Sequence, residues 1–582
     1  MPATYYRLTC EDNQSNLHRL RVCFLILSAF VILGVGQCHA QNFFRVDWRG
    51  LQGTSYQSRA FSTGENANKF MDSLSKEFRS LGYLMLSWEE IKKNDTLTFK
   101  LETGKQHSWK EVKQGNVPDE WWKKLGSPPD FYLGPYVWME TLVKSLENEG
   151  FPFASIKIDS LMAEDNLLNG VYKLDNGPLI LWDSLTVSGE SKTTQKYLQL
   201  YSGLVPGKPF SQKQFESGVR RISRSPYFQL DSIPYLGFQI KRATPHFKLR
   251  DRRINVFDGV VGLIPNQNQP NSMLLTGDIN LQLYHLGGKG RDIALQWQRP
   301  NFQSQNLNLS AKESYLFGSP LSFQLDFSLL KQDTSFVNRS VSFEFGYSIS
   351  ESGKIRFFNK RQAGDLIGGF GSAESLPAYL DYRWNSYGFG VNWNWLDDPI
   401  FTRKGSKIQA EFSVGNKNLI ENTAIPGEAY QGLDKSSTQL QAKFQLEKHV
   451  FLNSLWGMWL RMNTGMLKNE NLFLNELSRL GGLKSLRGFN EMYFFADRYA
   501  LFTMEQRLFF GKGSYLMAFG DLGIINNPFI SPRKDLPRSF GLGINLDTDG
   551  GLFSFVFGMG KSAFQPVSIS QARIHFGYLA RF

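Results

Sequence analysis

Residues 481–490 read Gly-Gly-Leu-Lys-Ser-Leu-Arg-Gly-Phe-Asn, a basic stretch with three glycines. Segments in which apolar and polar residues alternate lie on both sides of it. A glycine-rich polar stretch between two such segments predicts a loop between strands. The fold therefore depends on what those strands are, and the end of the chain is the most informative of them.

The chain ends in Ala-Arg-Ile-His-Phe-Gly-Tyr-Leu-Ala-Arg-Phe, residues 572–582. Every second side chain is apolar and these side chains share one face of a strand: Ile574, Phe576, Tyr578, Ala580 and Phe582. A strand of about 11 residues is long enough to cross a bilayer at a tilt. An apolar last strand with an aromatic end is typical of an outer-membrane barrel, and Phe576, Tyr578 and Phe582 are the predicted C-terminal assembly signal.

The same alternation recurs over much of the second half, for example at 321–329, 341–349 and 440–447. A soluble β-sandwich would also alternate, but its strands usually have about 5–6 residues. Runs of about nine to eleven residues favour a barrel with one face in lipid. At about 20 residues for a strand and its connection, residues 252–582 predict a transmembrane antiparallel β-barrel of about sixteen strands.

The barrel must close, because lipid offers no hydrogen-bond partner to an open sheet edge. The first strand, predicted at 254–264, must therefore meet the last, predicted at 573–582. The first strand contains Gly259 and Gly262 and ends at Pro265, and these residues weaken strand pairing. The glycines predict either a weak seam that opens sideways or a site where they relieve crowding.

Composition agrees with a barrel. The mean hydropathy of −0.31 is too low for a helical membrane protein. The 48 Phe and 53 Gly fit a barrel with an apolar, aromatic outside and a polar lumen, and also a large soluble β-protein, so the alternation decides between the two. The net charge of +12 could face anionic lipid or lipopolysaccharide phosphates, or could be spread over solvated loops and the lumen. The basic residues accompany no aromatic nucleic-acid motif, so no nucleic acid partner is expected.

Residues 1–40 predict a secretory signal peptide, with Arg19 and Arg21 ahead of an apolar run at 22–36. Cys10, Cys23 and Cys38 are the only cysteines and all lie in this segment. Cleavage after Ala40 would leave no thiol for disulfide or thiolate chemistry. Cys38 could instead be lipidated, but Gln37 occupies a position where a lipobox has a small residue.

An internal repeat precedes the barrel, because Gly104 and Trp109 recur as Gly177 and Trp182 at a spacing of 73 residues. Strand patterns at 97–102 and 171–175 precede these turns, and helical patterns occur at 66–80, 139–148 and 211–224. The predicted unit is strand, helices, strand, strand. The predicted modules span 41–105, which is divergent, 106–178 and 179–251.

The tetrad Leu486-Arg487-Gly488-Phe489 is followed by Phe-Gly-Asp-Leu-Gly at 519–523, by Ser-Phe-Gly-Leu-Gly-Ile-Asn-Leu at 539–546 and by Phe582. In this order the motifs resemble the barrels of the bacterial outer-membrane assembly superfamily, the bacterial surface antigen family. That superfamily includes BamA- and TamA-like insertases and two-partner secretion transporters. The resemblance covers roughly residues 150–582 and implies sixteen strands, polypeptide-transport-associated (POTRA) modules, and a tetrad on a long extracellular loop folded into the lumen.

A cation in a lumen needs a partner. Glu505 is the first candidate for Arg487, because Thr503, Glu505 and Arg507 form the polar face of one strand. Asp521 is the second and matches the family's acidic position, although its apolar neighbours leave its facing open. Leu486, Arg487, Gly488, Phe489, Glu505 and Asp521 thus form a predicted lumen latch, which gates the barrel or only stabilises it.

Residues 558–562, Gly-Met-Gly-Lys-Ser, resemble the end of a phosphate-binding loop, but Phe555 stands where the motif needs glycine. The sequence contains no Gly-x-Ser-x-Gly nucleophile elbow and no His-Glu-x-x-His metal motif. We therefore expect no catalytic residue, metal or cofactor, and no enzyme activity.

The resemblance implies an outer-membrane protein of a Gram-negative bacterium, with its modules in the periplasm, that assists insertion or translocation of polypeptides. Expected partners are unfolded outer-membrane or secreted polypeptides, outer-membrane lipid and lipopolysaccharide, and accessory proteins of the periplasm or inner membrane. The alternative is a two-partner secretion transporter that exports one adhesin or toxin. A passive porin-like channel is a third interpretation, which leaves the modules unexplained.

Overall fold

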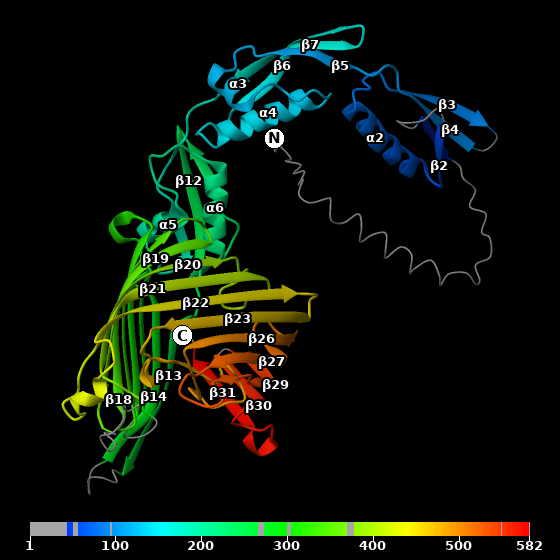
Figure 1. The fold of residues 1–582 in the computed structure, drawn as a ribbon. Coiled ribbons are helices and arrows are strands. Elements are labelled where there is room, and N and C mark those ends of the chain that lie inside the picture. The colour runs from blue at the N-terminus through cyan, green and yellow to red at the C-terminus, as the bar shows by residue number, and fades with distance from the viewer. Residues whose placement is uncertain are drawn as a thin grey trace, which may run out of the picture. The chain divides into compact units, whose positions relative to one another are not determined.

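The computed structural model describes residues 44–49, 56–93, 96–265, 273–299, 304–368, 378–548 and 550–580, and Figure 1 shows its fold. The chain divides into two compact units, Met1–Val143 with Ser155–Asp175, and Lys144–Ala154 with Asn176–Phe582. The predicted signal peptide and the terminal Phe582 lie outside the described residues. No described helix is long and apolar enough to cross a membrane.

The first unit begins with a four-stranded sheet in the order β2-β1-β4-β3. Its elements are β1 (Phe44–Arg49), β2 (Tyr56–Phe61), α2 (Gly64–Ser80), β3 (Ser87–Lys93) and β4 (Thr96–Glu102). Strand β1 is parallel to β4, which is antiparallel to β3. The Thr63 side chain caps α2, and Leu74 and Phe78 of this helix pack with Leu101.

The second sheet of this unit has the order β5-β7-β6. Its elements are β5 (Ser108–Lys113), α3 (Asp119–Leu125), α4 (Gly134–Glu147), β6 (Ser155–Glu164) and β7 (Leu167–Asp175). The rings of Trp138 and Tyr172 stack with centroids 4.8 Å apart, and both side chains are buried.

The third sheet belongs to the second unit. Its elements are β8 (Leu181–Trp182), β9 (Thr186–Glu190), α5 (Gln195–Ser202), α6 (Gln212–Ser223), β10 (Phe228–Leu230), β11 (Tyr235–Gln239) and β12 (Arg242–Asp251). Strand β12 is parallel to β9 and antiparallel to β11. Thr194 and Ser211 cap the two helices with their hydroxyl groups, as residues of these types prefer to do.

The three sheets share a parallel pairing of first and last strands and an antiparallel pairing of the last two. The expected helices between first and second strand are present in the second and third modules, but the first module has one helix and the extra strand β2 instead. Residues 56–61 form the extra strand because they are extended, with side chains on alternate faces, and pair with β1 along their whole length. The sheets end at Glu102, Asp175 and Asp251.

The rest of the second unit is a nearly closed antiparallel barrel of sixteen long strands, as predicted (Figure 1). They are β13 (Val256–Pro265), β14 (Met273–Leu286), β15 (Arg291–Arg299), β16 (Gln305–Glu313), β17 (Leu321–Gln332), β18 (Phe336–Ser348), β19 (Gly353–Leu366), β20 (Tyr382–Asn394), β21 (Gly405–Leu419), β22 (Ser436–Phe451), β23 (Trp456–Lys468), β26 (Arg498–Phe509), β27 (Tyr515–Asn526), β29 (Arg538–Thr548), β30 (Gly551–Lys561) and β31 (Arg573–Ala580). A short strand, β28 (Lys534–Asp535), pairs with the end of β27.

Many of these strands are longer than the nine to eleven residues expected, and β22 has 16 residues. The ladder between β21 and β22 continues in register over almost its whole length, so pairing extends beyond what a bilayer crossing needs. As predicted, successive side chains along a strand point alternately to the outside of the barrel and to the lumen. On β27, Leu522 and Ile524 are exposed on the outside, while Phe519 and Asp521 are buried.

The third module contacts the barrel at the turn between β14 and β15. The ring of Tyr227 stacks on His285 with centroids 4.8 Å apart, and its hydroxyl donates to Asp292 Oδ2 at 2.8 Å. The backbone N–H and the hydroxyl of Thr194 both donate to the carbonyl of Gly288. These hydrogen bonds and the ring stacking fix the position of this turn on the module.

Candidate functional site

The connection between β23 and β26, residues 469–497, folds over the inner side of the barrel wall. It contains a short 3-10 helix, Leu474–Glu476, and two short strands, β24 (Ser478–Leu480) and β25 (Phe494–Ala496), which pair antiparallel. We call this segment the lumen loop. It carries the tetrad at 486–489, all four residues of which are buried.

Arg487 of the lumen loop lies between two carboxylates on neighbouring strands. Its Nε donates to Asp521 Oδ2 at 2.9 Å and its Nη2 to Asp521 Oδ1 at 2.8 Å. Its Nη1 donates to Glu505 Oε2 at 2.6 Å, and its backbone N–H also reaches Asp521 at 3.1 Å. The structure thus brings both sequence-predicted acids to the predicted arginine, and Asp521 faces the lumen.

The surroundings of this cluster shield it from water. The three side chains are 5%, 2% and 0% exposed. The guanidinium carbon of Arg487 stands 3.6 Å from the centroid of the Phe519 ring. Arg507 donates to the second oxygen of Glu505 at 2.7 Å. Because each carboxylate is paired, the buried charges compensate each other, and loss of one partner would leave an unpaired charge in the wall.

Gly488 fits a slot that sequence reasoning did not find. Its φ is +80°, and a Cβ atom there would stand 2.8 Å from the backbone carbon of Met559 and 2.9 Å from the nitrogen of Gly560, both on β30. A Cβ on Gly560 would in turn strike the Phe489 ring at 2.6 Å. The Gly-Met-Gly segment at 558–560, rejected above as a phosphate-binding loop, is therefore the surface on which the tetrad packs.

Leu486 and Phe489 secure the tetrad by apolar contacts. Both are fully buried, in a cluster with Leu480, Phe494, Ala496, Leu501 and Ile525. The Phe489 ring meets Phe494 edge to face with centroids 4.9 Å apart. The cluster joins the two short strands of the lumen loop to β26 and β27.

The first part of the lumen loop, before the tetrad, contacts two strands that lie earlier in the barrel, β17 and β21. Buried Lys417 of β21 pairs with Glu476 and donates to the carbonyl of Asn471 at 2.6 Å. Arg479 donates to Gln332 of β17 at 2.7 Å. The lumen loop therefore contacts β17 and β21 as well as β26, β27 and β30.

The seam between β13 and β31 departs from the expected closure, and it differs from the contacts between the other neighbouring strands of the barrel order, which are paired. In the barrel sheet each strand is hydrogen-bonded to the next, from β13 at one edge to β31 at the other. Cα atoms of β13 and β31 approach within 8 Å, but no pairing between these two strands is present among the described residues. Gly259 and Gly262 pair with Ile279 and Thr276 in an unbroken ladder with β14. The glycines thus do not interrupt that side of the first strand.

The last strand presents its predicted apolar face outward. Ile574 and Phe576 are 64% and 68% exposed, and Tyr578 lies on the same face, where its ring packs against Phe553 of β30 with centroids 4.4 Å apart. The role of this face in assembly stays a prediction, and Phe582 lies outside the described residues. Within the described parts of the chain, no three His, Cys, Asp or Glu side chains gather as metal ligands.

The model of the Omp85 superfamily domain matches residues 285–582. No curated protein matches the sequence. Among solved structures, CdiB from Escherichia coli is 11% identical and covers 89% of this chain and 97% of its own, with a TM-score of 0.52. CdiB from Acinetobacter baumannii is 12% identical, with coverages of 89% and 98% and a TM-score of 0.50.

BamA from Haemophilus ducreyi lacking POTRA domains 1–3 is 15% identical, with coverages of 81% and 98% and a TM-score of 0.43. At 11% and 12% identity the two CdiB structures support the fold alone. The family model, in contrast, spans more than half of the 582 residues and includes the lumen loop and both acids that bind Arg487. The chain therefore belongs to the Omp85 superfamily, whose barrels lie in the outer membrane of Gram-negative bacteria.

Proposed function

We propose that this protein assists the insertion or translocation of polypeptides at the outer membrane, in the manner of the BamA- and TamA-like insertases that it resembles. The observation that carries the proposal is the seam, where β13 and β31 approach without strand pairing among the described residues. An unpaired strand edge is a template for another strand. A substrate strand could therefore pair there and pass sideways into the lipid.

The lumen loop supports a lateral route over a lumenal one. It contacts strands from both halves of the barrel order and is held by buried ion pairs at Arg487 and Lys417. Passage through the lumen would require these contacts to separate. Opening the seam would break no strand ladder between β13 and β31.

The three modules would lie in the periplasm and receive unfolded substrates. Each sheet has open edges, for example β3 in the first and β6 in the second. Such edges bind extended chains through the backbone and so tolerate different sequences. The action proposed is non-covalent, with no catalytic residue and no cofactor, and the partners are unfolded outer-membrane or secreted polypeptides with accessory proteins of the periplasm or inner membrane.

Locking the seam tests the route. One cysteine at 256–258 and one at 577–580 should form a disulfide at the right register, because Cα atoms of β13 and β31 approach within 8 Å and a disulfide forms when the Cα atoms come to about 4.4–6.8 Å. The oxidised protein should fold and reach the membrane but lose activity, and a reductant should restore it. Substrate assembly at the normal rate in the locked protein would refute the lateral route.

Ser328→Cys with Ser340→Cys is a matched control. These residues are directly opposed on β17 and β18, and their hydroxyl oxygens are 2.7 Å apart. A disulfide there crosses a ladder that need not open, so it should leave activity unchanged.

Depletion of the protein, followed by comparison of the whole outer-membrane proteome, tests the breadth of function. Loss of many barrel proteins would support the insertase. Loss of one secreted adhesin or toxin would instead indicate a dedicated two-partner transporter. The three module sheets favour the first result, because such transporters usually carry two modules.

A further inference from the structure

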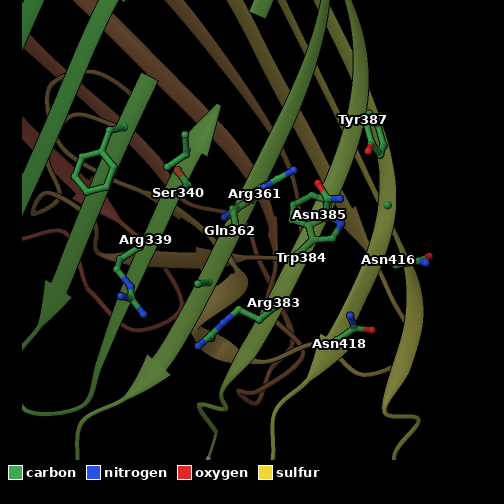
Figure 2. Close-up of a pocket in the computed structure, with 14 residues that line it drawn as sticks. Arg339, Ser340, Arg361, Gln362, Arg383, Trp384, Asn385, Tyr387, Asn416 and Asn418 are labelled. Atoms are coloured by element: carbon green, nitrogen blue, oxygen red, sulfur yellow. The ribbon is translucent and has the colours of Figure 1, made fainter. Parts of the chain in front are cut away.

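An open notch of about 760 Å³ lies on the barrel wall across β18, β19, β20 and β21 (Figure 2). Side chains alternate across these strands, so those that share the face of Phe345 point away from the lumen. Arg339, Arg361 and Arg383 belong to this outer face and are all exposed. Three cations on the outer wall of a membrane barrel need an explanation, because that face otherwise meets lipid.

The strand registers place these cations at one end of an apolar band. Four phenylalanines form a row across the four strands: Phe345, Phe357, Phe389 and Phe412. Two residues further along each strand, the row is Phe343, Asn359, Tyr387 and Val414. The next row is Val341, Arg361, Asn385 and Asn416, and the one after is Arg339, Ala363, Arg383 and Asn418.

The spacing fits the depth of one leaflet. At about 3.4 Å per residue, Arg361 lies about 14 Å and Arg383 about 20 Å along the strands from the phenylalanine row. A strand tilt of about 40° shortens these distances to roughly 10 and 16 Å along the membrane normal. Half of the hydrocarbon core is about 15 Å thick. If the phenylalanine row lies near the middle of the membrane, the arginines therefore reach the headgroup boundary.

The charge of the notch is positive. Asp365 pairs with both Arg339 and Arg383, at 2.6 Å for the latter, and so holds them side by side. Within the described residues, no carboxylate lies within ion-pair distance of Arg361, which leaves its guanidinium available. Three cations and one anion leave a net charge of +2, and guanidinium groups match phosphate with paired N–H donors.

The end of the barrel that carries the notch is opposite the third module. The turn between β18 and β19 contacts that module, because Arg220 of α6 donates to Glu351 at 2.9 Å. The arginines occur at the other end of the same strands. With the modules in the periplasm, as the proposed function has it, the notch faces the outer leaflet.

We propose that this notch binds a phosphorylated glycolipid of the outer leaflet, with phosphate on Arg361, Arg383 and Arg339 and acyl chains on the apolar side chains below. Phe327, Val341 and Tyr387 line the same notch and offer this apolar surface. The polar neighbours Asn385, Asn416 and Asn418 suit the hydroxyl groups of a sugar headgroup. The cationic and apolar parts thus match both halves of an amphipathic lipid.

Purified full-length protein in a neutral detergent tests the site, with lipid A as probe and native mass spectrometry to count bound lipid. The wild type should retain lipid A, and an excess of inorganic phosphate should not displace it. Arg361→Gln with Arg383→Gln should weaken binding at least about tenfold, since each lost charge-assisted contact is worth about a factor of ten. Arg533→Gln, an exposed arginine in a later loop, should bind like the wild type.

Lipid A stripped of its phosphates distinguishes charge from general lipid affinity and should bind at least about tenfold more weakly. Equal binding of the stripped lipid, unchanged binding by the double variant, or displacement by inorganic phosphate would each overturn the proposal. Heat-modifiable migration on gels confirms that each variant is folded, and Arg361→Lys keeps the charge if glutamine disturbs the wall. The assay contains no polypeptide substrate, so its failure would leave the proposed function standing.

Discussion

The lumen loop and the seam are opposite kinds of contact within one barrel. At the lumen loop, Arg487 makes four hydrogen bonds to two buried carboxylates. At the seam, β13 and β31 are near each other but have no pairing among the described residues. The difference teaches that the wall comes close to closure without a ladder between its first and last strands. Contacts inside the barrel contribute stability that the seam does not supply.

Arg487→Ala should have the largest effect on this comparison. Removal of one partner from a buried pair costs about 3–5 kcal/mol, because Asp521 would lose the guanidinium that pairs with it, while Glu505 would keep Arg507. Arg533→Ala, at an exposed position, should cost about 0–1 kcal/mol. Denaturant unfolding, followed by heat-modifiable migration, measures both. Equal losses would mean that the lumen loop contributes no more than a surface contact.

Gly488→Ala should have the next largest effect on the free energy of unfolding, because the new Cβ would meet the backbone of β30. Gly432 gives a matched control, since its φ of +83° is close to the +80° of Gly488 but nothing lies within 4 Å of its added Cβ. Both substitutions include the backbone strain of a positive φ, about 1–3 kcal/mol at most. The difference in unfolding free energy between them isolates the slot on β30. No difference would show that the lumen loop can shift without loss.

Arg220→Ala should have the smallest effect. Its pair with Glu351 joins the third module to the β18–β19 turn, but the side chains are 48% and 24% exposed. Exposed pairs contribute about 0–1 kcal/mol. The hydrogen bond from Arg220 lowers the pKa of the Glu351 carboxyl.

The contribution of this pair should therefore be fully present above the unfolded pKa of Glu351 and be lost as the pH falls through the lowered folded value. Measurement of stability at pH 7 and at pH 3 for the wild type and Arg220→Ala checks the sign. If Arg220→Ala lost more stability than Arg487→Ala, the contact of the third module, and not the lumen loop, would be the stronger support of the barrel.

Much of this fold follows from local sequence. Period-two alternation predicts the barrel and the facing of Glu505, because side-chain direction on a strand depends on position alone. The length of residues 252–582, at about 20 residues for a strand and its connection, predicts the strand number. Arg487 was predicted to seek an acid because a lumenal cation needs one. The identity of the tetrad as a family motif came from resemblance rather than from these rules.

Other features depend on contacts between distant segments. The slot on β30 requires that Gly488 meet Gly560, which are 72 residues apart, and no local pattern carries that information. The extra strand of the first module forms because β1 offers an edge to residues 56–61. The outer arginines of β18–β20 become a notch only through the registers of neighbouring strands.

The contacts between the third module and the barrel have a mechanical consequence. The module contacts the turns β14–β15 and β18–β19. Arg252, which directly follows the last strand of the module and donates to the carbonyl of Phe228, also donates to Asp398 in the β20–β21 turn at 3.0 Å. All three turns connect strands among the first nine of the sixteen long strands, counted from β13. We expect a force applied to the module to act as a torque on these strands and to reach the free edge of β13 through its ladder with β14. A movement of the module would then pull on β13, one of the two strands of the seam, and not on β31.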